Sequence, residues 1–352
     1  MLQIYLPIAE VTINVATLLF VSVVVGFFAG LLGIGGGFLL TPILIFLGIP
    51  PIYAVANGAN NILAASVSGT IGHWFKDQLD IKMGILIIVG GVVGAIFGIF
   101  LFKYFLLQGS VNKIISIMYC ILLSGIGLSM LIESLIEIRR IRLNRFIRRK
   151  LHTHYWVHNL PFKIRIHKSK LYISIIPPVF FGAVVGILSS MLGVGGGFLL
   201  VPIMIYILGM PARLVAGTSL FVMIFIMIVV TLLHAINHNS VDIFLVLILV
   251  VGSGIGAQLG TKISIKLKGE ELRAMMSLLV LIFGFKFGYD LFFNKTIPSV
   301  DITSVLQPNN TNALADFAIH VSQVFPWSYA IASMSIAILV GVLAAFSFKK
   351  FL

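Results

Sequence analysis

The sequence predicts an all-α integral membrane protein: an inverted duplication of a five-segment helical repeat with glycine-broken half-helices, plus one extra C-terminal span. Three observations carry this prediction: the composition, apolar runs of spanning length, and two near-identical copies of one glycine-rich motif. Of the 352 residues, 59% are hydrophobic and only 10% are charged. The polar side chains are too few to cover a soluble fold of this size. The composition therefore excludes a soluble enzyme, a disordered chain and a disulfide scaffold.

Eleven apolar runs follow one another along the chain, five before a basic stretch and six after it. Most of them are long enough to cross a hydrocarbon core of roughly 30 Å as a helix. Two short runs, 35–48 and 195–209, are not, and each lies at a glycine cluster. They are typical of half-helices or of the return arms of re-entrant hairpins, and whether they cross or re-enter stays open.

The predicted spans divide the chain into five parts. These parts are the first transmembrane repeat (1–135), a basic cytoplasmic loop (136–170), the second transmembrane repeat (171–293), an external loop (294–325) and the additional C-terminal span (326–352). The first and sixth apolar runs, 11–33 and 171–193, open the two repeats.

Positive charge is concentrated in the central loop. Eleven of the 24 Lys and Arg lie between Glu137 and Lys170, against one acidic residue, so this stretch carries about ten of the thirteen net positive charges. Because short cytoplasmic loops are enriched in Lys and Arg, we expect loop 136–170 and the C-terminus inside and the N-terminus outside. Anionic lipids are compatible partners of this loop. No nucleic-acid motif accompanies the charge, so no nucleic-acid partner is expected.

The two halves of the chain repeat one another. Gly33–Pro42 (GIGGGFLLTP) and Gly193–Pro202 (GVGGGFLLVP) share eight of ten residues at an offset of 160. Five apolar runs per repeat is an odd number, so consecutive copies must enter the membrane from opposite sides, as in many secondary transporters. A glycine ladder that favours close helix packing recurs at an offset of 162, as Gly90, Gly94 and Gly98 and as Gly252, Gly256 and Gly260.

The doubled motif predicts a helix break inside the membrane. A break leaves N–H groups unpaired at the start of the next half-helix, and its positive dipole end binds an anion without a charged side chain. Pro42 and Pro202 fit the first turn of such a half-helix. The alternative is that the glycines only allow close packing. The predicted anion-binding backbone belongs to Gly35, Gly36 and Gly37 and to Gly195, Gly196 and Gly197.

Neutral polar side chains near the motifs complete the predicted substrate shell. Asn57, Asn60 and Asn61 lie at the start of the third run, and Thr218 and Ser219 occupy the matching place in the second half. Amides and hydroxyls can hydrogen-bond an oxyanion without the desolvation cost of a buried cation. The alternative is N-terminal capping together with helix–helix hydrogen bonding.

Three more polar residues are candidates. Gln258 lies in the helix of the second glycine ladder, where it needs a partner or a ligand. His73 and His234 end corresponding helices and could relay a proton, the alternative being simple solvation. His238 lies four residues after His234 without the intervening Glu of a zinc protease, so no metal site is predicted. The chain offers no nucleophile–base pair or carboxylate dyad, so we expect neither an enzyme nor a cofactor.

With these residues, the sequence resembles the TauE/SafE family of membrane permeases, the sulfite-exporter-like proteins. The resemblance rests on Gly33–Pro42 and Gly193–Pro202, followed by Ala56-Asn-Gly and Ala216-Gly-Thr-Ser219, and it covers approximately 15–135 and 172–293. It implies a bacterial or archaeal cytoplasmic (inner) membrane and transport of small sulfur-containing anions, such as sulfite, sulfoacetate and other organosulfonates. The chain departs from the family pattern where Asn57-Gly-Ala-Asn60 replaces the usual Gly-Thr-Ser, in its long central loop and in its extra span.

The sequence therefore predicts a secondary transporter of a small anion, a sulfur-containing oxyanion or an organosulfonate, that works by alternating access between the two repeats. A passive anion channel, a membrane enzyme and a non-transporting membrane scaffold are the alternatives. The expected partners are the small anionic substrate and the lipid bilayer. The substrate itself, the direction of transport, the coupling ion and the oligomeric state stay open.

Overall fold

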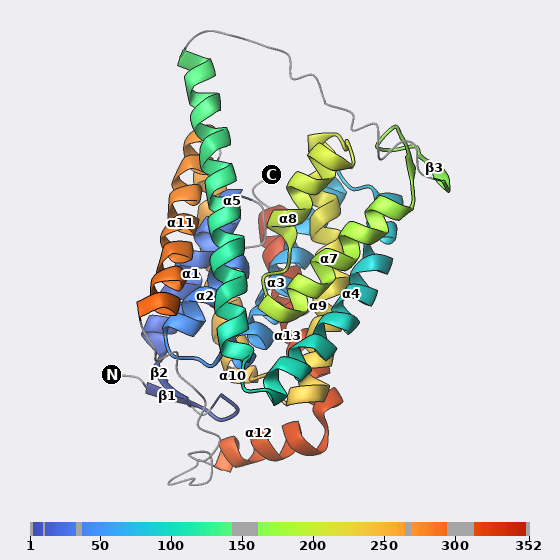
Figure 1. Ribbon diagram of the computed structural model, residues 1–352. Coiled ribbons are helices and arrows are strands. Elements are labelled where there is room, and N and C mark those ends of the chain that lie inside the picture. The colour runs from blue at the N-terminus through green and yellow to red at the C-terminus, as the bar shows by residue number, and fades with distance from the viewer. Residues whose placement is uncertain are drawn as a thin grey trace.

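A long helical bundle makes up most of the protein (Figure 1). The computed structural model describes residues 3–9, 11–32, 37–142, 161–264, 269–293 and 313–349. The helices of the first half are α1 (Val15–Leu32), α2 (Gly37–Phe46), α3 (Pro51–Phe75), α4 (Ile81–Leu107) and α5 (Val111–Arg142). Those of the second half are α7 (Ile176–Leu192), α8 (Gly197–Pro202), continued by the π-helical turn η1 (Ile203–Ile207), α9 (Ala212–His238), α10 (Ile243–Ser264), α11 (Gly269–Phe293), α12 (Ala313–Val324) and α13 (Pro326–Lys349).

Several helices are built to lie in lipid. Among the described residues, five helices are long and apolar enough to cross a membrane: Ile81–Leu107, Val111–Ile136, Arg213–His238, Ile243–Gly260 and Pro326–Phe346. Their outer faces expose large apolar side chains; Val93 and Phe97 on α4 and Leu339 on α13 are each about 60% exposed. A soluble protein would cover so much apolar surface. The predicted class, a multi-pass helical membrane protein, is therefore confirmed.

Two short antiparallel hairpins, β1–β2 and β3–β4, were not predicted from the sequence. They are formed by β1 (Gln3–Leu6) with β2 (Val11–Asn14) and by β3 (Lys163–Ile166) with β4 (Leu171–Ser174). The apolar runs predicted at 11–33 and 171–193 thus begin as strands and become helical only after four or five residues. The strands of the two hairpins lie 160 residues apart, the offset of the glycine motif.

The hairpins lie at opposite ends of the bundle (Figure 1). The β1–β2 hairpin and α12 lie at the bottom of the figure, which we call the lower end, and the β3–β4 hairpin lies at the upper end. Helix α12 occupies part of the loop predicted at 294–325, and α5 continues to Arg142, past the end of the first repeat predicted at 135.

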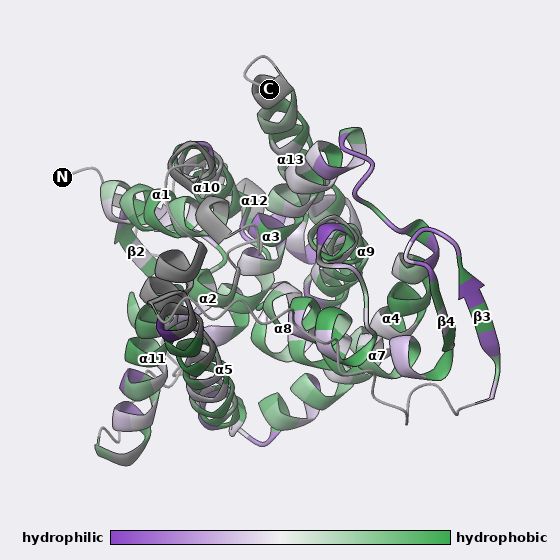
Figure 2. Ribbon diagram, turned by 90° about the horizontal axis from the view of Figure 1, so that it is seen from above, coloured by the Kyte–Doolittle hydropathy of each residue, from purple (hydrophilic) through white to green (hydrophobic). Residues whose placement is uncertain are grey.

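Long helices of one half pack against long helices of the other. Helix α1 lies along α10, α4 along α7, α5 along α11, and α3 against α9 and α13. Seen from above, α3 and α8 lie near the middle, and the first three pairs surround them (Figure 2). Neither half therefore forms a bundle by itself.

The glycine ladders create two of these contacts. A Cβ atom on Gly90 or Gly94 of α4 would overlap a backbone carbonyl oxygen of α7, and one on Gly256 of α10 would overlap the Val23 oxygen of α1. Only glycine lets the backbones approach this closely. The close helix packing that the ladders predicted is confirmed.

The α1–α2 pair begins and ends at the lower end of the bundle, and the α7–α8 pair begins and ends at the upper end. Helix α1 follows β2 at the lower end, and Tyr53 at the start of α3 packs against the cluster that Ile8 of the β1–β2 turn forms with Tyr329. Helix α2 therefore returns the chain to the end at which α1 began. Helix α7 follows β4 at the upper end, and α9 starts beside the β3–β4 turn, with Thr218 hydrogen-bonded to Asp80 next to Ser169. Helix α8 and η1 form the matching return arm.

The glycine contacts predict a sharp difference between neighbouring positions of α10. Gly256→Ala should lower the midpoint of thermal unfolding in detergent, since its methyl group must push α10 away from α1; overpacking of this kind costs about 1–3 kcal/mol. Gly254→Ala, two residues earlier, adds a methyl group with no atom within 4 Å and should leave the midpoint unchanged. Equal losses in the two variants would contradict the packing described here.

Candidate functional site

The two copies of the glycine motif meet in the interior of the bundle. Phe38 and Phe198 hold the same place in the two motifs, and their ring centroids lie 5.6 Å apart. The Thr41 hydroxyl of the first motif donates a hydrogen bond of 3.2 Å to the Gly193 carbonyl oxygen, at the start of the second. Segments 160 residues apart therefore form one centre.

The side chain of Ile62 on α3 lies between the two motifs. A Cβ atom on Gly37, the first residue of α2, would overlap Ile62, and one on Gly195 would lie 2.9 Å from its Cγ2 atom. We call these residues (Gly37, Phe38, Thr41, Gly193, Gly195, Phe198 and Ile62) the motif junction. Gly35 and Gly36, also predicted to bind the anion, lie outside the described residues.

The second motif contains a helix break. Helix α7 ends at Leu192, and Gly193, Gly195 and Gly196 have φ angles of +64°, +75° and +57°. This left-handed backbone strains any residue with a Cβ atom, which explains the glycines. Helix α8 starts at Gly197, and the Gly196 carbonyl accepts its first hydrogen bonds, from the N–H groups of Leu199 (3.0 Å) and Leu200 (2.8 Å). The N–H groups of the residues before Leu199 have no acceptor within the helix and are directed toward its N-terminal end.

The prolines lie one turn deeper than predicted. Pro42 and Pro202 are the sixth residues of α2 and α8, not first-turn residues, because the last glycine and the Phe-Leu-Leu of each motif are already helical. The prediction on Pro42 and Pro202 was therefore wrong. After Pro202 the helix widens, and the N–H group of Leu208 donates to the Ile203 carbonyl oxygen five residues earlier, at 3.0 Å. Proline lacks an N–H donor, and its ring clashes with the carbonyl group four residues earlier in a regular helix. A wide turn leaves room for the ring and for the missing hydrogen bond.

One residue of the motif region was missed in the sequence. Ser189 on α7 is fully buried, and its hydroxyl has no hydrogen-bond partner within the described part of the chain. A Cβ atom on Gly196 would lie 3.3 Å from this hydroxyl oxygen. Ser189 thus brings an unused donor to the break before α8. Its signal in the sequence was a serine inside an apolar run, one turn before the second glycine motif.

Asn57 joins α3 to the loop before α10. Its amide nitrogen donates to the carbonyl oxygens of Tyr53 (2.7 Å) and Ser240 (3.2 Å), and its amide oxygen accepts from the N–H group of Asp242 (2.8 Å). The side chain is fully buried. Asn61 accepts a hydrogen bond from the Ser253 hydroxyl of α10. These two predicted site residues are thus bound to the second half of the protein.

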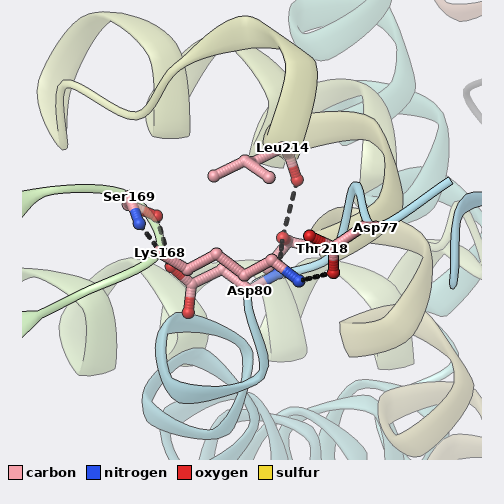
Figure 3. A network of polar contacts seen from close by, with 6 residues as sticks. All are labelled: Asp77, Asp80, Lys168, Ser169, Leu214 and Thr218. Atoms are coloured by element: carbon pink, nitrogen blue, oxygen red, sulfur yellow. Dashed lines mark hydrogen bonds and ion pairs between the residues drawn. The ribbon is translucent and has the colours of Figure 1, made fainter.

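Thr218 makes the equivalent link at the upper end. Its hydroxyl oxygen accepts from the N–H group of Asp80 at 3.0 Å and donates to the Leu214 carbonyl oxygen at 2.6 Å (Figure 3). The Ser219 hydroxyl donates to the Ala216 carbonyl oxygen of its own helix at 2.9 Å. Gln258 is partly buried on α10, five residues beyond the serine that binds Asn61.

Asn60 differs from its two neighbours. It is fully buried, yet among the described residues neither atom of its amide has a hydrogen-bond partner. It shares a helix face with Ala64 and Val67, which lie against Gly341 of α13. Ile62 is two residues on and points to nearly the opposite side of α3. The structure therefore does not bring Asn60 to the motif junction.

The predicted histidines have different environments. His234 is fully buried, its Nε2 atom lies 2.8 Å from the Ser190 carbonyl oxygen, and its Nδ1 atom has no partner in the described chain. His238 packs beside it, with ring centroids 5.4 Å apart, and Phe102 contacts both rings edge-on. His73 is half-buried and lies 3.0 Å from the Gln78 side-chain oxygen. The alternative given for His234, simple solvation, is therefore wrong, because its side chain is buried.

Two buried aspartates, also missed in the sequence, hold the hairpins. Asp80 caps α4 by accepting from the Met83 N–H group at 3.2 Å, and it binds the N–H group (3.0 Å) and hydroxyl of Ser169 in the β3–β4 turn (Figure 3). Asp242, 162 residues later, caps α10 and accepts from the N–H group of Ile8 in the β1–β2 turn at 3.1 Å. Each half of the chain thus fixes the hairpin of the other half.

Asp242 lies just outside the span that begins at Ile243. Burial raises the pKa of its carboxyl group above the ordinary value, while hydrogen bonds from the backbone N–H groups of Ile8, Leu245, Phe244 and Ala9 oppose this shift. Only two adjacent residues, Asp80-Ile81 and Asp242-Ile243, recur at this place, which is a weak signal in the sequence.

Asn57 and Asn60 provide a matched pair of substitutions. Asn57→Ala should destabilise the protein more than Asn60→Ala, because it leaves the Ser240 oxygen and the Asp242 N–H group buried without partners. An unsatisfied buried group costs about 1–3 kcal/mol, and the same side-chain atoms are removed at both positions. Chemical unfolding in detergent measures the difference. Equal destabilisation would contradict the link between α3 and the loop before α10.

Comparison with known proteins places the chain in a family. Residues 18–287 match the family described as "Sulfite exporter TauE/SafE". The chain is 27% identical to the "Probable membrane transporter protein YjnA" of Bacillus subtilis (strain 168) over 271 residues, which cover 77% of this chain and 98% of that protein. It is 24% identical to YunE of the same organism over 286 residues (78% and 98%). It is 26% identical to MJ0441 of Methanocaldococcus jannaschii over 280 residues (76% and 92%).

Both of these further relatives are also named probable membrane transporter proteins. No solved structure gives a significant match. The family match extends over most of the chain and agrees with the lipid-facing helices and the doubled glycine motif. The chain belongs to the TauE/SafE sulfite exporter family of membrane transporters.

Proposed function

We propose that this protein is a secondary transporter of a small anion, a sulfur-containing oxyanion or an organosulfonate, and that the anion binds at the motif junction. The observation that carries the proposal is the meeting of the two motifs around Ile62, which brings together the starts of two return-arm helices. N–H groups and the positive dipole end at a helix start favour an anion. The family description, which names sulfite export, supports the substrate class.

The Ser189 hydroxyl strengthens the argument for a ligand beside the second motif. Most buried hydroxyl groups have a hydrogen-bond partner, and this one, like those of Ser66, Thr70 and Thr231, has none within the described residues. It lies next to Gly196, where the left-handed backbone exposes the start of α8. An oxyanion there would accept from the hydroxyl and from backbone N–H groups without a buried cation.

Inverted repeats moving against each other would give alternating access. Several features support an inversion. The α1–α2 pair begins and ends at the lower end and the α7–α8 pair at the upper end, and the hairpins and their capping aspartates lie at opposite ends. Helix α1 corresponds to α7 and α4 to α10. Exchanging the two halves would therefore turn the α1–α10 pair into the α7–α4 pair, and both pairs are present.

For the orientation, we propose that the upper end faces the cytoplasm. Arg139 near the end of α5 and the basic residues Lys163, Arg165, Lys168 and Lys170 of the β3–β4 hairpin lie there, and Lys and Arg favour the cytoplasmic side. His234, with His238 beside it, lies toward the lower end and is the proposed proton-coupling group.

Counterflow in proteoliposomes tests the proposed function. Vesicles loaded with sulfite, sulfoacetate, thiosulfate, sulfate or short carboxylates should take up at least one labelled sulfur anion by saturable exchange, and a pH gradient should change the rate if His234 couples protons. Flux without saturation or counterflow would favour a channel. Silence across the panel, from protein shown to be folded, would contradict the sulfur-anion assignment.

The motif junction is tested with matched glycine variants. Gly196→Leu should reduce counterflow at least tenfold without preventing membrane insertion, because its Cβ atom would overlap Val185 and crowd the start of α8. Gly209→Leu has the same backbone strain, with φ of +71°, but the nearest atom to its Cβ lies 3.9 Å away, outside the junction. Counterflow should survive there. Equal loss in both would show that backbone strain, not the junction, matters.

A further inference from the structure

A cavity of about 200 Å³ opens at the upper end of the bundle, separate from the motif junction. Three segments that are far apart in the sequence line it: the loop between α3 and α4, the β3–β4 turn and the start of α9. The lining residues are Lys76, Asp77, Gln78, Lys168, Arg213 and Leu214. The volume is sufficient for a small oxyanion with a few water molecules, each of which takes roughly 30 Å³ in the liquid.

The lining carries an excess of two positive charges. Lys76, Lys168 and Arg213 face one carboxylate, Asp77, and each of the three cations comes from a different segment. Asp77 forms an ion pair with Lys168 (Figure 3). The Asp77 side chain is 88% exposed and that of Lys168 is 39% exposed, so water screens the pair. Such pairs contribute little to stability, so an anion could replace Asp77 at low cost.

The two attachments of the β3–β4 turn are unequal. Ser169 is fixed by its N–H group and its hydroxyl to Asp80, which is buried. Lys168, the preceding residue, is held only by the exposed carboxylate of Asp77 among the contacts described (Figure 3). The turn can therefore stay in place while the lysine exchanges its partner.

The equivalent place at the lower end shows that the fold does not require these charges. At offsets of 160 to 162, Lys168 corresponds to Ile8, Arg213 to Tyr53, Asp77 to Asn239 and Lys76 to His238. Asp77 and Asn239 share the left-handed backbone, with φ of 55° and 47°.

At that lower end the space is closed by apolar packing. Ile8 packs with Tyr329 of α13, and Tyr53 packs against this cluster. The same architecture is thus closed by apolar side chains at one end and is open and basic at the other. The exposed Lys163, Arg165 and Lys170 of the hairpin add to the positive field around the open end, which attracts anions.

We propose that this upper cavity binds a small oxyanion, preferably a dianion, through Lys76, Lys168 and Arg213, with Lys168 exchanging Asp77 for the anion. A free inorganic anion and the phosphate monoester of a lipid headgroup share this chemistry. In the transporter proposed above, the cavity would be the access site at the upper end. That role rests on the proposed function, whereas the binding does not.

Equilibrium binding of radiolabelled sulfate and phosphate to the full-length protein tests the site, in neutral detergent at constant ionic strength. At least one probe should bind saturably, and Lys168→Gln and Arg213→Gln should each weaken that binding at least tenfold. Lys170→Gln removes the same charge from the same turn, outside the cavity, and should change the affinity less than twofold. All three residues are exposed, so the variants should fold.

The proposal is overturned if neither probe binds saturably, or if Lys170→Gln weakens binding as much as Lys168→Gln does. Phosphatidic acid, compared with phosphatidylcholine, identifies the natural source of the anion. Displacement of the probe by phosphatidic acid would assign the site to a lipid headgroup and overturn the access role; no displacement supports a free anion. If counterflow fails while Lys168-dependent binding persists, the proposed function fails and the anion site stands.

Discussion

Backbone contact between the two halves of the chain is the constraint on which the rest of the structure depends. Glycines on α4 and α10 let these helices touch the backbones of α7 and α1, which belong to the opposite half. Lipid provides no hydrophobic force between helices, so close van der Waals contact must hold them together. Because the long helices find their partners across the halves, the short arms α2 and α8 are brought face to face. The motif junction is therefore a product of this pairing.

Buried hydrogen bonds add to the glycine contacts in joining the two halves. Asn57 and Thr218 tie a central helix of each half to the loop of the other, and Asp242 and Asp80 then hold the two hairpins. The chemistry of the two ends differs although their architecture matches. The lower end is closed by tyrosines and Ile8, while the upper end is open and basic. The two ends therefore match in architecture and differ in charge.

Composition and repeats predicted most of the fold, since lipid-facing helices and close glycine contacts leave strong patterns in a sequence. The hairpins were missed because four-residue strands beside an apolar helix look like part of the span. The predicted place of Pro42 in the first helical turn was wrong, because residue types alone do not show where a helix begins within a glycine cluster. Asp80 and Asp242 matched over too few residues to attract notice.

The candidate site was harder to predict, because side-chain direction depends on helix phase. Asn57, Asn60 and Asn61 are close in sequence, yet the first and last bind the second half of the protein and Asn60 lies on the α13 side of α3. Ser189 was overlooked because a serine in an apolar run has no pattern of its own. Only the folded structure shows that its hydroxyl group is buried without a partner beside Gly196.

The accessibility of Ser189 tests the central claim, alternating access to the motif junction, most directly. The chain has one cysteine, Cys120, so Ser189→Cys in a Cys120→Ala background gives a single reporter. A membrane-impermeant thiol reagent should modify it from either side of the membrane, and sulfoacetate or another transported anion should slow both reactions. Modification from one side only, with no protection by any anion of the panel, would contradict the account.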